Sequence, residues 1–90
     1  MTMYQLILSN KAEKSLDKLK KKDKKNFEIV IKHLENLTQN PKFYGKPLKS
    51  NLAGLWSCRA GDFRIIYQIE ESKLIVIVIT IEHRKSVYDM

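Results

Sequence analysis

The sequence predicts an α+β fold in which two helices pack on one face of a curved, mostly antiparallel sheet. Apolar residues recur at helical spacing between Asn10 and Asn40, and short apolar runs separated by turn residues fill positions 55–80. A further β-prone run precedes the helices, at residues 3–8. Helices and strands that are segregated along the chain in this way are typical of α+β domains, whose helices cover one face of the sheet.

The N-terminal half is predicted to form a strand followed by a helical hairpin. The run MYQLIL at residues 3–8 is short, apolar and β-prone. Ser9 or Asn10 can cap the first helix, and the Asn-Pro pair at residues 40–41 ends the second. The lysine-rich run at residues 18–25 covers the end of the first helix, a tight turn and the start of the second. The residues at helical spacing are Ala12, Leu16, Leu19, Phe27, Val30 or Ile31, Leu34 and Leu37.

The C-terminal half is predicted to form a loop and then three strands in an antiparallel meander. Residues 41–54 contain both prolines and two of the three glycines, so they form the main loop. The strands are expected at residues 55–60, 63–69 and 73–80, with a turn at 70–72 between the last two. Because the run LIVIVIT lacks polar alternation, the last strand is expected to be central and covered on both faces.

The middle hairpin contains an unusual pair of like charges. A two-residue turn at Gly61-Asp62 places Arg59 directly opposite Arg64, and like charges in that position are destabilising. Either the hairpin tolerates a small penalty, or an anion binds between the arginines. Strand alternation directs six side chains toward the helices: Trp56, Cys58, Phe63, Ile65, Tyr67 and Ile69. The uncovered face then carries Ser57, Arg59, Arg64, Ile66 and Gln68.

The 90 residues are few enough to predict a single domain over 1–90. Charge is distributed unevenly along this chain. The net charge of +7 arises in residues 1–50, which hold twelve lysines and five acidic residues. All three arginines lie in the electrically neutral remainder. Lysine is a flexible point charge, whereas the arginine fork suits phosphate. This division indicates an anionic partner that is attracted over a broad surface and held at a smaller one, although lysine-rich helices can also simply maintain solubility.

Several classes of protein are not expected from this composition. Cys58 is the single cysteine, so no intrachain disulfide can form, and a reducing cytoplasm is the natural location. The N-terminus lacks the pattern of a signal peptide, and the apolar run at residues 74–79 is too short to cross a bilayer. His33 and His83 are far apart in sequence, and no phosphate loop or nucleophile elbow is present. We therefore expect no metal site and no cofactor.

The C-terminal segment groups residues that can act on a phosphodiester. His83, Arg84, Lys85 and Tyr88 combine cations, which stabilise developing charge, with titratable groups that transfer protons. The plainer interpretations are a surface histidine at a strand end and a tyrosine that folds back on the sheet. His33, by contrast, is expected to be a half-exposed helix residue.

The run GDFRIIYQIEESKLIVIVITIEHRKSVY, the order of elements and the basic helical hairpin together resemble the RelE family. RelE proteins are toxins of toxin–antitoxin systems that cleave messenger RNA on the ribosome without a metal. The resemblance covers essentially the whole chain, and its most specific parts are the hairpin motif GDFRIIY and the terminal HRKSVY. The wider superfamily also contains ParE-like toxins, which share the scaffold and inhibit DNA gyrase.

The resemblance implies roles for individual residues. In RelE proteins the ribose 2′-hydroxyl of the mRNA attacks the adjacent phosphate. Arg64 matches the strand arginine that contacts this phosphate, and Arg84 matches the cation that stabilises the transition state or acts as general acid. Tyr88 matches the tyrosine that stacks on the nucleotide. The supporting RNA-binding cations are expected to be Arg59, Lys46, Lys49 and Lys85.

The general base is left open by the resemblance. Many RelE proteins carry lysines on the second strand, where this chain has Leu55 and Ser57. His83 is a candidate because related toxins use a nearby histidine.

The resemblance also implies partners: a RelB-like antitoxin protein, ribosomal RNA and mRNA, all in the cytoplasm. Two other functions compete with mRNA cleavage. One is a ParE-like toxin that binds gyrase without cleaving RNA, and the other is a small basic RNA-binding module without activity. The second is disfavoured because the uncovered face of the predicted strands carries no aromatic residue for base stacking.

Overall fold

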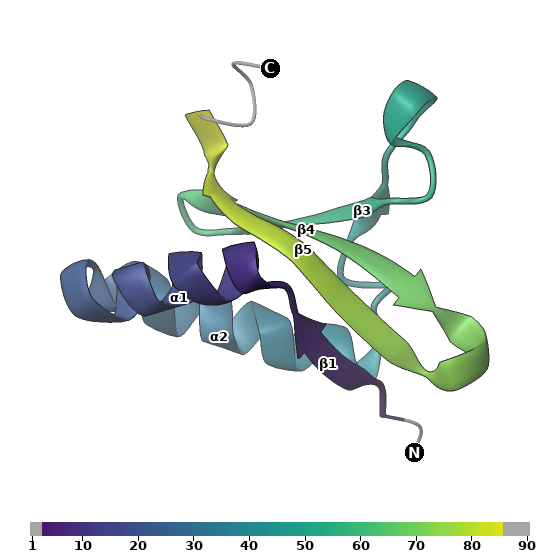
Figure 1. The fold of residues 1–90 in the computed structure, drawn as a ribbon, viewed down its shortest axis with the longest axis horizontal. Helices are drawn as coiled ribbons and strands as arrows, with labels where there is room; N and C mark the ends of the chain where they lie inside the picture. The colour runs from purple at the N-terminus through teal and green to yellow at the C-terminus, as the bar shows by residue number, and fades with distance from the viewer. Residues whose placement is uncertain (1–2, 86–90) are drawn as a thin grey trace.

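Two helices lie side by side against one face of a five-stranded sheet, and the opposite face of the sheet is uncovered (Figure 1). The computed structural model describes residues 3–85 of the chain. Its helices are α1 (Asn10–Lys22) and α2 (Lys24–Gln39), with short 3₁₀ turns η1 (Ser50–Leu52) and η2 (Glu71–Lys73). Its strands are β1 (Gln5–Leu8), β2 (Lys46–Pro47), β3 (Trp56–Ala60), β4 (Phe63–Glu70) and β5 (Ile75–His83). The predicted α+β architecture is confirmed.

The sheet has the strand order β1-β5-β4-β3-β2. The three C-terminal strands form the predicted antiparallel meander, and β1 adds to it in parallel beside β5. The helical hairpin leads from β1 at one edge of the sheet to β2 at the other edge, and it crosses one face on the way. The helices therefore cover a single face.

Short polar side chains set the ends of both helices. The Ser9 hydroxyl accepts a hydrogen bond from the backbone N–H of Ala12 at 3.0 Å, so Ser9 is the N-cap of α1. Asp23 alone separates the helices, and its carboxylate accepts the N–H of Asn26 to cap α2. Hydrogen bonds from the side chain and backbone of Asn26 hold the pKa of Asp23 below its ordinary value. As expected, α2 ends before Pro41, with Asn40 as its C-cap.

The core lies between the helices and the sheet, and it contains most of the residues that periodicity indicated. Its buried members are Ala12, Leu19, Val30, Leu34, Leu37, Cys58, Ala60, Ile65, Tyr67, Val76, Val78 and Ile81. Burial raises the pKa of the Cys58 thiol, as expected for a small core residue. The lysines of the helical hairpin face outward: Lys11, Lys14, Lys18, Lys20, Lys21, Lys22, Lys24, Lys25 and Lys32 are all exposed.

Two expectations about the C-terminal half need correction. The segment at residues 41–54 is not wholly a loop, because β2 and η1 form within it and β2 pairs with β3. The last strand is central but is not covered on both faces. Helices cover the side of Val76 and Val78, whereas Ile77 and Ile79 remain half-buried. Within residues 3–85, no helix is long and apolar enough to cross a membrane.

Candidate functional site

The hairpin of β3 and β4 has the register that its turn residues predicted. Ala60 pairs with Phe63, and Arg59 lies directly opposite Arg64. Gly61 adopts the left-handed backbone conformation, with φ of 63°, that a tight hairpin turn requires. A side chain at this glycine would also meet the Asn26 amide oxygen at 2.7 Å, so the turn needs glycine for space as well as for conformation.

Asn26 holds the hairpin turn against the helices. It is buried, and its amide nitrogen donates to the carboxylate of Asp23 at 2.7 Å and more weakly to that of Asp62 at 3.4 Å. The carbonyl of Asp62 accepts the backbone N–H of Arg84 at 2.9 Å. Asn26 thus joins the turn to the helix junction, and Asp62 joins the turn to the residue after β5. Sequence reasoning missed Asn26, whose only signal was a polar residue within an apolar helical stripe.

A bulge in β5 decides which residue of that strand lies beside Arg64. Tyr67 pairs with Val78 but Ile66 pairs with Thr80, so Ile79 is an extra residue in β5. One extra residue moves the side chain of every residue that follows it in the strand to the other face of the sheet. As a result Ile81 points into the core, and Glu82 lies opposite Arg64 on the uncovered face.

Arg59, Arg64 and Glu82 therefore form a row across three neighbouring strands of the uncovered face. Directly opposite side chains in such pairs are about 4.5–5.5 Å apart at Cβ. The Nζ of Lys11, from the first turn of α1, lies 3.0 Å from the Glu82 carboxylate. This hydrogen bond is the main reason that the pKa of Glu82 lies below its ordinary value. The row combines two guanidinium groups with an ionised carboxylate.

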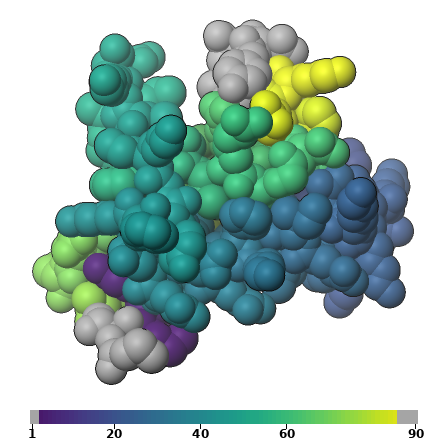
Figure 2. All heavy atoms as spheres, turned by 180° about the vertical axis from the view of Figure 1, so that it is seen from behind, coloured from purple at the N-terminus to yellow at the C-terminus, as the bar shows by residue number. Residues whose placement is uncertain are grey.

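The row borders a hollow of about 260 Å³ on the uncovered face. Its walls are apolar on the side of η1, and its polar end is formed by Lys11, Arg64, Thr80 and Glu82. The segment that contains η1 projects from the sheet opposite the end of β5 (Figure 1). Figure 2 shows from behind that this teal segment stands above the green strands beside it. The uncovered face is therefore concave.

A second hollow, of about 480 Å³, lies where the loop after α2 meets β3. Arg64 lines both hollows, and Arg59 and Lys46 line the second. The other lining residues are Phe43, Tyr44, Gly45, Ser57 and Cys58. We predicted that the strands carry no exposed aromatic residue on the uncovered face. The loop after α2 nevertheless supplies two exposed rings, because Phe43 is 74% and Tyr44 40% exposed.

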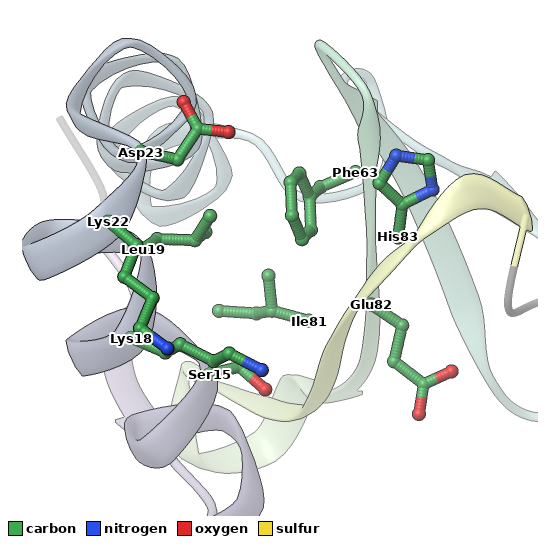
Figure 3. Close-up of a pocket in the computed structure, with 9 residues that line it drawn as sticks. All are labelled: Ser15, Lys18, Leu19, Lys22, Asp23, Phe63, Ile81, Glu82 and His83. Carbon is green, nitrogen blue, oxygen red and sulfur yellow. The ribbon is translucent and has the colours of Figure 1, made fainter.

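His83 lies on the opposite face from the arginine row. It pairs with Phe63, and the two rings meet edge to face with centroids 5.3 Å apart. Both rings line a cavity of about 600 Å³ against α1 (Figure 3). In Figure 3 the Glu82 carboxylate points away from this cavity, on the other side of the β5 ribbon. The structure thus separates His83 from Arg64, and its role as general base stays a prediction that this placement weakens.

The remaining described candidates lie after β5, in β2 and before η1. Arg84 lines a small hollow of about 260 Å³ with Asp62, His83 and Lys85, and within residues 3–85 its buried Nε has no hydrogen-bond partner. Lys46 lies in β2, and Lys49 precedes η1 at the surface. Tyr88 lies outside the described residues. No group of three or more potential metal ligands occurs in the described part of the chain.

Comparisons with known proteins agree on one family. The model of the "ParE toxin of type II toxin–antitoxin system" matches residues 6–88. RelE4 of Methanocaldococcus jannaschii is 30% identical over 87 residues, which are 96% of this chain and 92% of RelE4. Toxin RelG of Mycobacterium tuberculosis is 36% identical over 53 residues, 59% of this chain, and the match spans only 61% of RelG. The toxin–antitoxin complex RelBE2 from M. tuberculosis contains a similar chain, with a TM-score of 0.81 and 29% identity over 91% of this chain and 99% of that one.

Proposed function

This chain belongs to the RelE/ParE family of type II toxin–antitoxin toxins, and from that premise we propose that it is a RelE-type endoribonuclease that cleaves mRNA on the ribosome. The observation that carries the proposal is the row Arg59–Arg64–Glu82 on the uncovered, concave face of the sheet. Two arginines beside a carboxylate supply the charges that phosphodiester cleavage needs. In this proposal the protein works in the cytoplasm, as a single domain and without a cofactor.

The arginines act on the phosphate. The guanidinium groups of Arg59 and Arg64 lie on adjacent strands and can both donate to one phosphate. That anion resolves the repulsion between them, and Arg64 interacts most with the charge that develops in the transition state. The ribose 2′-oxygen bonds to phosphorus while the bond to the 5′-oxygen breaks, which leaves a 2′,3′-cyclic phosphate and a 5′-hydroxyl.

Glu82 accepts the proton of the 2′-hydroxyl in this proposal. Its carboxylate lies on the same face as Arg64, and its lowered pKa keeps it ionised at neutral pH. A lowered pKa also weakens a base, but the negative charge of an incoming phosphate raises it again. The leaving 5′-oxygen takes its proton from Arg84 or from water, and Tyr88 stacks on the nucleotide, as the resemblance implies. Lys49 and Lys85 support binding as surface cations, and the lysines of the helices attract ribosomal RNA.

The partner that restrains this activity is proposed to be a RelB-like antitoxin, because the similar chain in RelBE2 comes from a toxin–antitoxin complex. The cavity beside α1 suits a partly apolar segment of such a partner, with acidic side chains beside the exposed Lys18 and Lys22. Leu19, Phe63 and Ile81 line it with apolar surface, and its charged lining residues are Lys18, Lys22, Asp23 and Glu82.

Reversing the charges of this cavity tests the antitoxin contact. The double substitution Lys18→Glu and Lys22→Glu should weaken binding of the antitoxin by about tenfold or more, because it replaces attraction with repulsion. Affinity is measured by titrating the labelled antitoxin, with the double substitution Lys25→Glu and Lys32→Glu on α2 as the charge-matched exposed control. Equal affinity for both variants would place the contact elsewhere.

The main experiment measures cleavage of mRNA on programmed ribosomes with 3′ ends mapped by primer extension. Arg64→Ala should lower the cleavage rate by about 10²–10³-fold, the usual cost of losing one transition-state donor. Arg64→Lys keeps the charge but not the fork, and should recover only part of the rate. Retained cleavage by a folded Arg64→Ala protein would remove this residue from the mechanism.

Inhibition of DNA gyrase is the alternative function. A protein that only binds gyrase has no need of an arginine–carboxylate row in a concavity, and this observation favours cleavage. If the parent protein makes no cuts on ribosomes but inhibits DNA supercoiling, the gyrase alternative is correct.

A further inference from the structure

The loop that follows α2 exposes two adjacent aromatic rings beside the arginines. Phe43 is 74% exposed and Tyr44 is 40% exposed, and the rings meet edge to face with centroids 5.0 Å apart. Within residues 3–85 Phe43 is the most exposed of the large apolar residues. Such rings lose favourable burial energy unless they contact a partner.

The loop holds these rings in a defined position. The buried hydroxyl of Tyr67 donates to the carbonyl of Pro41 at 2.6 Å, and the N–H groups of Phe43 and Tyr44 both donate to the carbonyl of Asn40 at 3.2 Å. Gly45 then passes so close to Tyr67 that any side chain there would collide with its ring and hydroxyl. The aromatic pair is therefore presented by an anchored segment, which lowers the entropy cost of binding.

The surroundings of the two rings are cationic. The hollow of about 480 Å³ that they line also contains Lys46, Arg59 and Arg64, and none of its lining residues is acidic. Its volume is within the range of small-molecule sites. Aromatic rings beside a positively charged groove are the usual means of binding single-stranded nucleic acid, because every base has a face for stacking and every nucleotide carries a phosphate.

We infer that Phe43 and Tyr44 form a subsite for a nucleobase of single-stranded RNA, next to the phosphate that Arg59 and Arg64 hold. The inference rests on the proposed function for the identity of that phosphate. Arg64 connects the two sites because it lines both this hollow and the hollow beside Glu82. A protein partner is the less favoured occupant, because three cations without an acidic residue match a polyanion.

The test measures binding of a fluorescent RNA hexamer with 2′-O-methyl riboses, which cannot be cleaved, by anisotropy. Phe43→Leu and Tyr44→Leu keep an apolar side chain but remove the stacking surface, and each should weaken binding by about tenfold. Phe43→Tyr keeps the ring and should bind like the parent protein. Met3→Leu is the control, because Met3 is a comparably exposed apolar residue, at 65%, and does not line the hollow. Thermal unfolding verifies that each variant is folded.

The outcomes separate this inference from the proposed function. Weaker hexamer binding by the two leucine variants supports the subsite even if the parent protein never cleaves mRNA, in which case only the proposed function fails. Unchanged hexamer binding by the leucine variants, or no binding by the parent protein, overturns the inference even if Arg64→Ala abolishes cleavage. Loss of antitoxin binding in the leucine variants, with hexamer binding intact, assigns the rings to a protein contact and also overturns it.

Discussion

Glu82 and His83 are neighbours in β5, yet they belong to two different regions of the molecule. His83 faces α1, together with Phe63 and a layer of buried apolar residues. Glu82 faces the uncovered side of the sheet, where it lies opposite Arg64 and contacts Lys11. The helix-covered face holds the fold together by apolar burial, and the uncovered face carries the charges to which the proposed cleavage is assigned. In the proposed mechanism, function and stability are therefore separated by the thickness of one sheet.

The strongest test of this comparison replaces the titratable group of each neighbour, one at a time, by a glutamine amide. Glu82→Gln should lower the rate of mRNA cleavage by about 10²–10⁴-fold, the usual contribution of a general base, and should remove the acid limb of the pH profile. His83→Gln should leave the cleavage rate and the pH profile nearly unchanged, because the His83 ring lies on the other face of the sheet. Rates are measured on programmed ribosomes in single turnover. A large loss in His83→Gln with little change in Glu82→Gln would reverse the two roles.

A second neighbouring pair compares the faces by stability. Ile65 is fully buried against the helices, whereas Ile66 is half-buried on the uncovered face. Ile65→Ala should lower the free energy of unfolding by about 2–5 kcal/mol, since it leaves a cavity in the core. Ile66→Ala should cost clearly less, because it removes less contact. Urea unfolding monitored by the fluorescence of Trp56 measures both values. Similar losses would show that the uncovered face also stabilises the fold.

The smallest expected effect concerns the ion pair between Lys11 and Glu82. The pKa of Glu82 is lowered in the folded protein, so its ionised form favours folding above the ordinary pKa of 4.5. This contribution disappears as the pH falls through the folded-state pKa. It should be below about 1 kcal/mol, because the Lys11 side chain is 69% exposed. The difference in unfolding free energy between the parent protein and Glu82→Gln should therefore shrink between neutral pH and about pH 3. If this difference in unfolding free energy does not change with pH, the ion pair between Lys11 and Glu82 is not its source.

Much of the fold was predictable because it depends on short-range patterns. The Gly61-Asp62 turn sets the register that places Arg59 opposite Arg64, and this prediction is confirmed. Period-2 alternation correctly assigned Cys58, Ile65 and Tyr67 to the core. In each case the relevant signal lies within a few residues of its effect.

The composition of the candidate site was harder to predict. The run of apolar residues in β5 gives no alternation from which to assign faces, so the bulge at Ile79 was not visible in the sequence. Without that extra residue Glu82 would point toward the core and Arg64 would lie opposite Ile81. Phe43 and Tyr44 were likewise assigned to a loop, with no signal that the loop closes on Arg59.

The sequence by itself determined the helical hairpin, the strands other than β2, the β3–β4 register and the family. Local propensity, turn chemistry and apolar periodicity are encoded in neighbouring residues and account for the elements and the register, whereas the family followed from a resemblance to RelE proteins. Only the tertiary structure decided that Glu82 joins the arginine row, that His83 does not, and that an aromatic pair lines the adjacent hollow. These features depend on how β5 registers against β4 and on how a loop packs against the sheet. Contacts between residues far apart in sequence fix both, through the requirement that Ile81 and Tyr67 be buried.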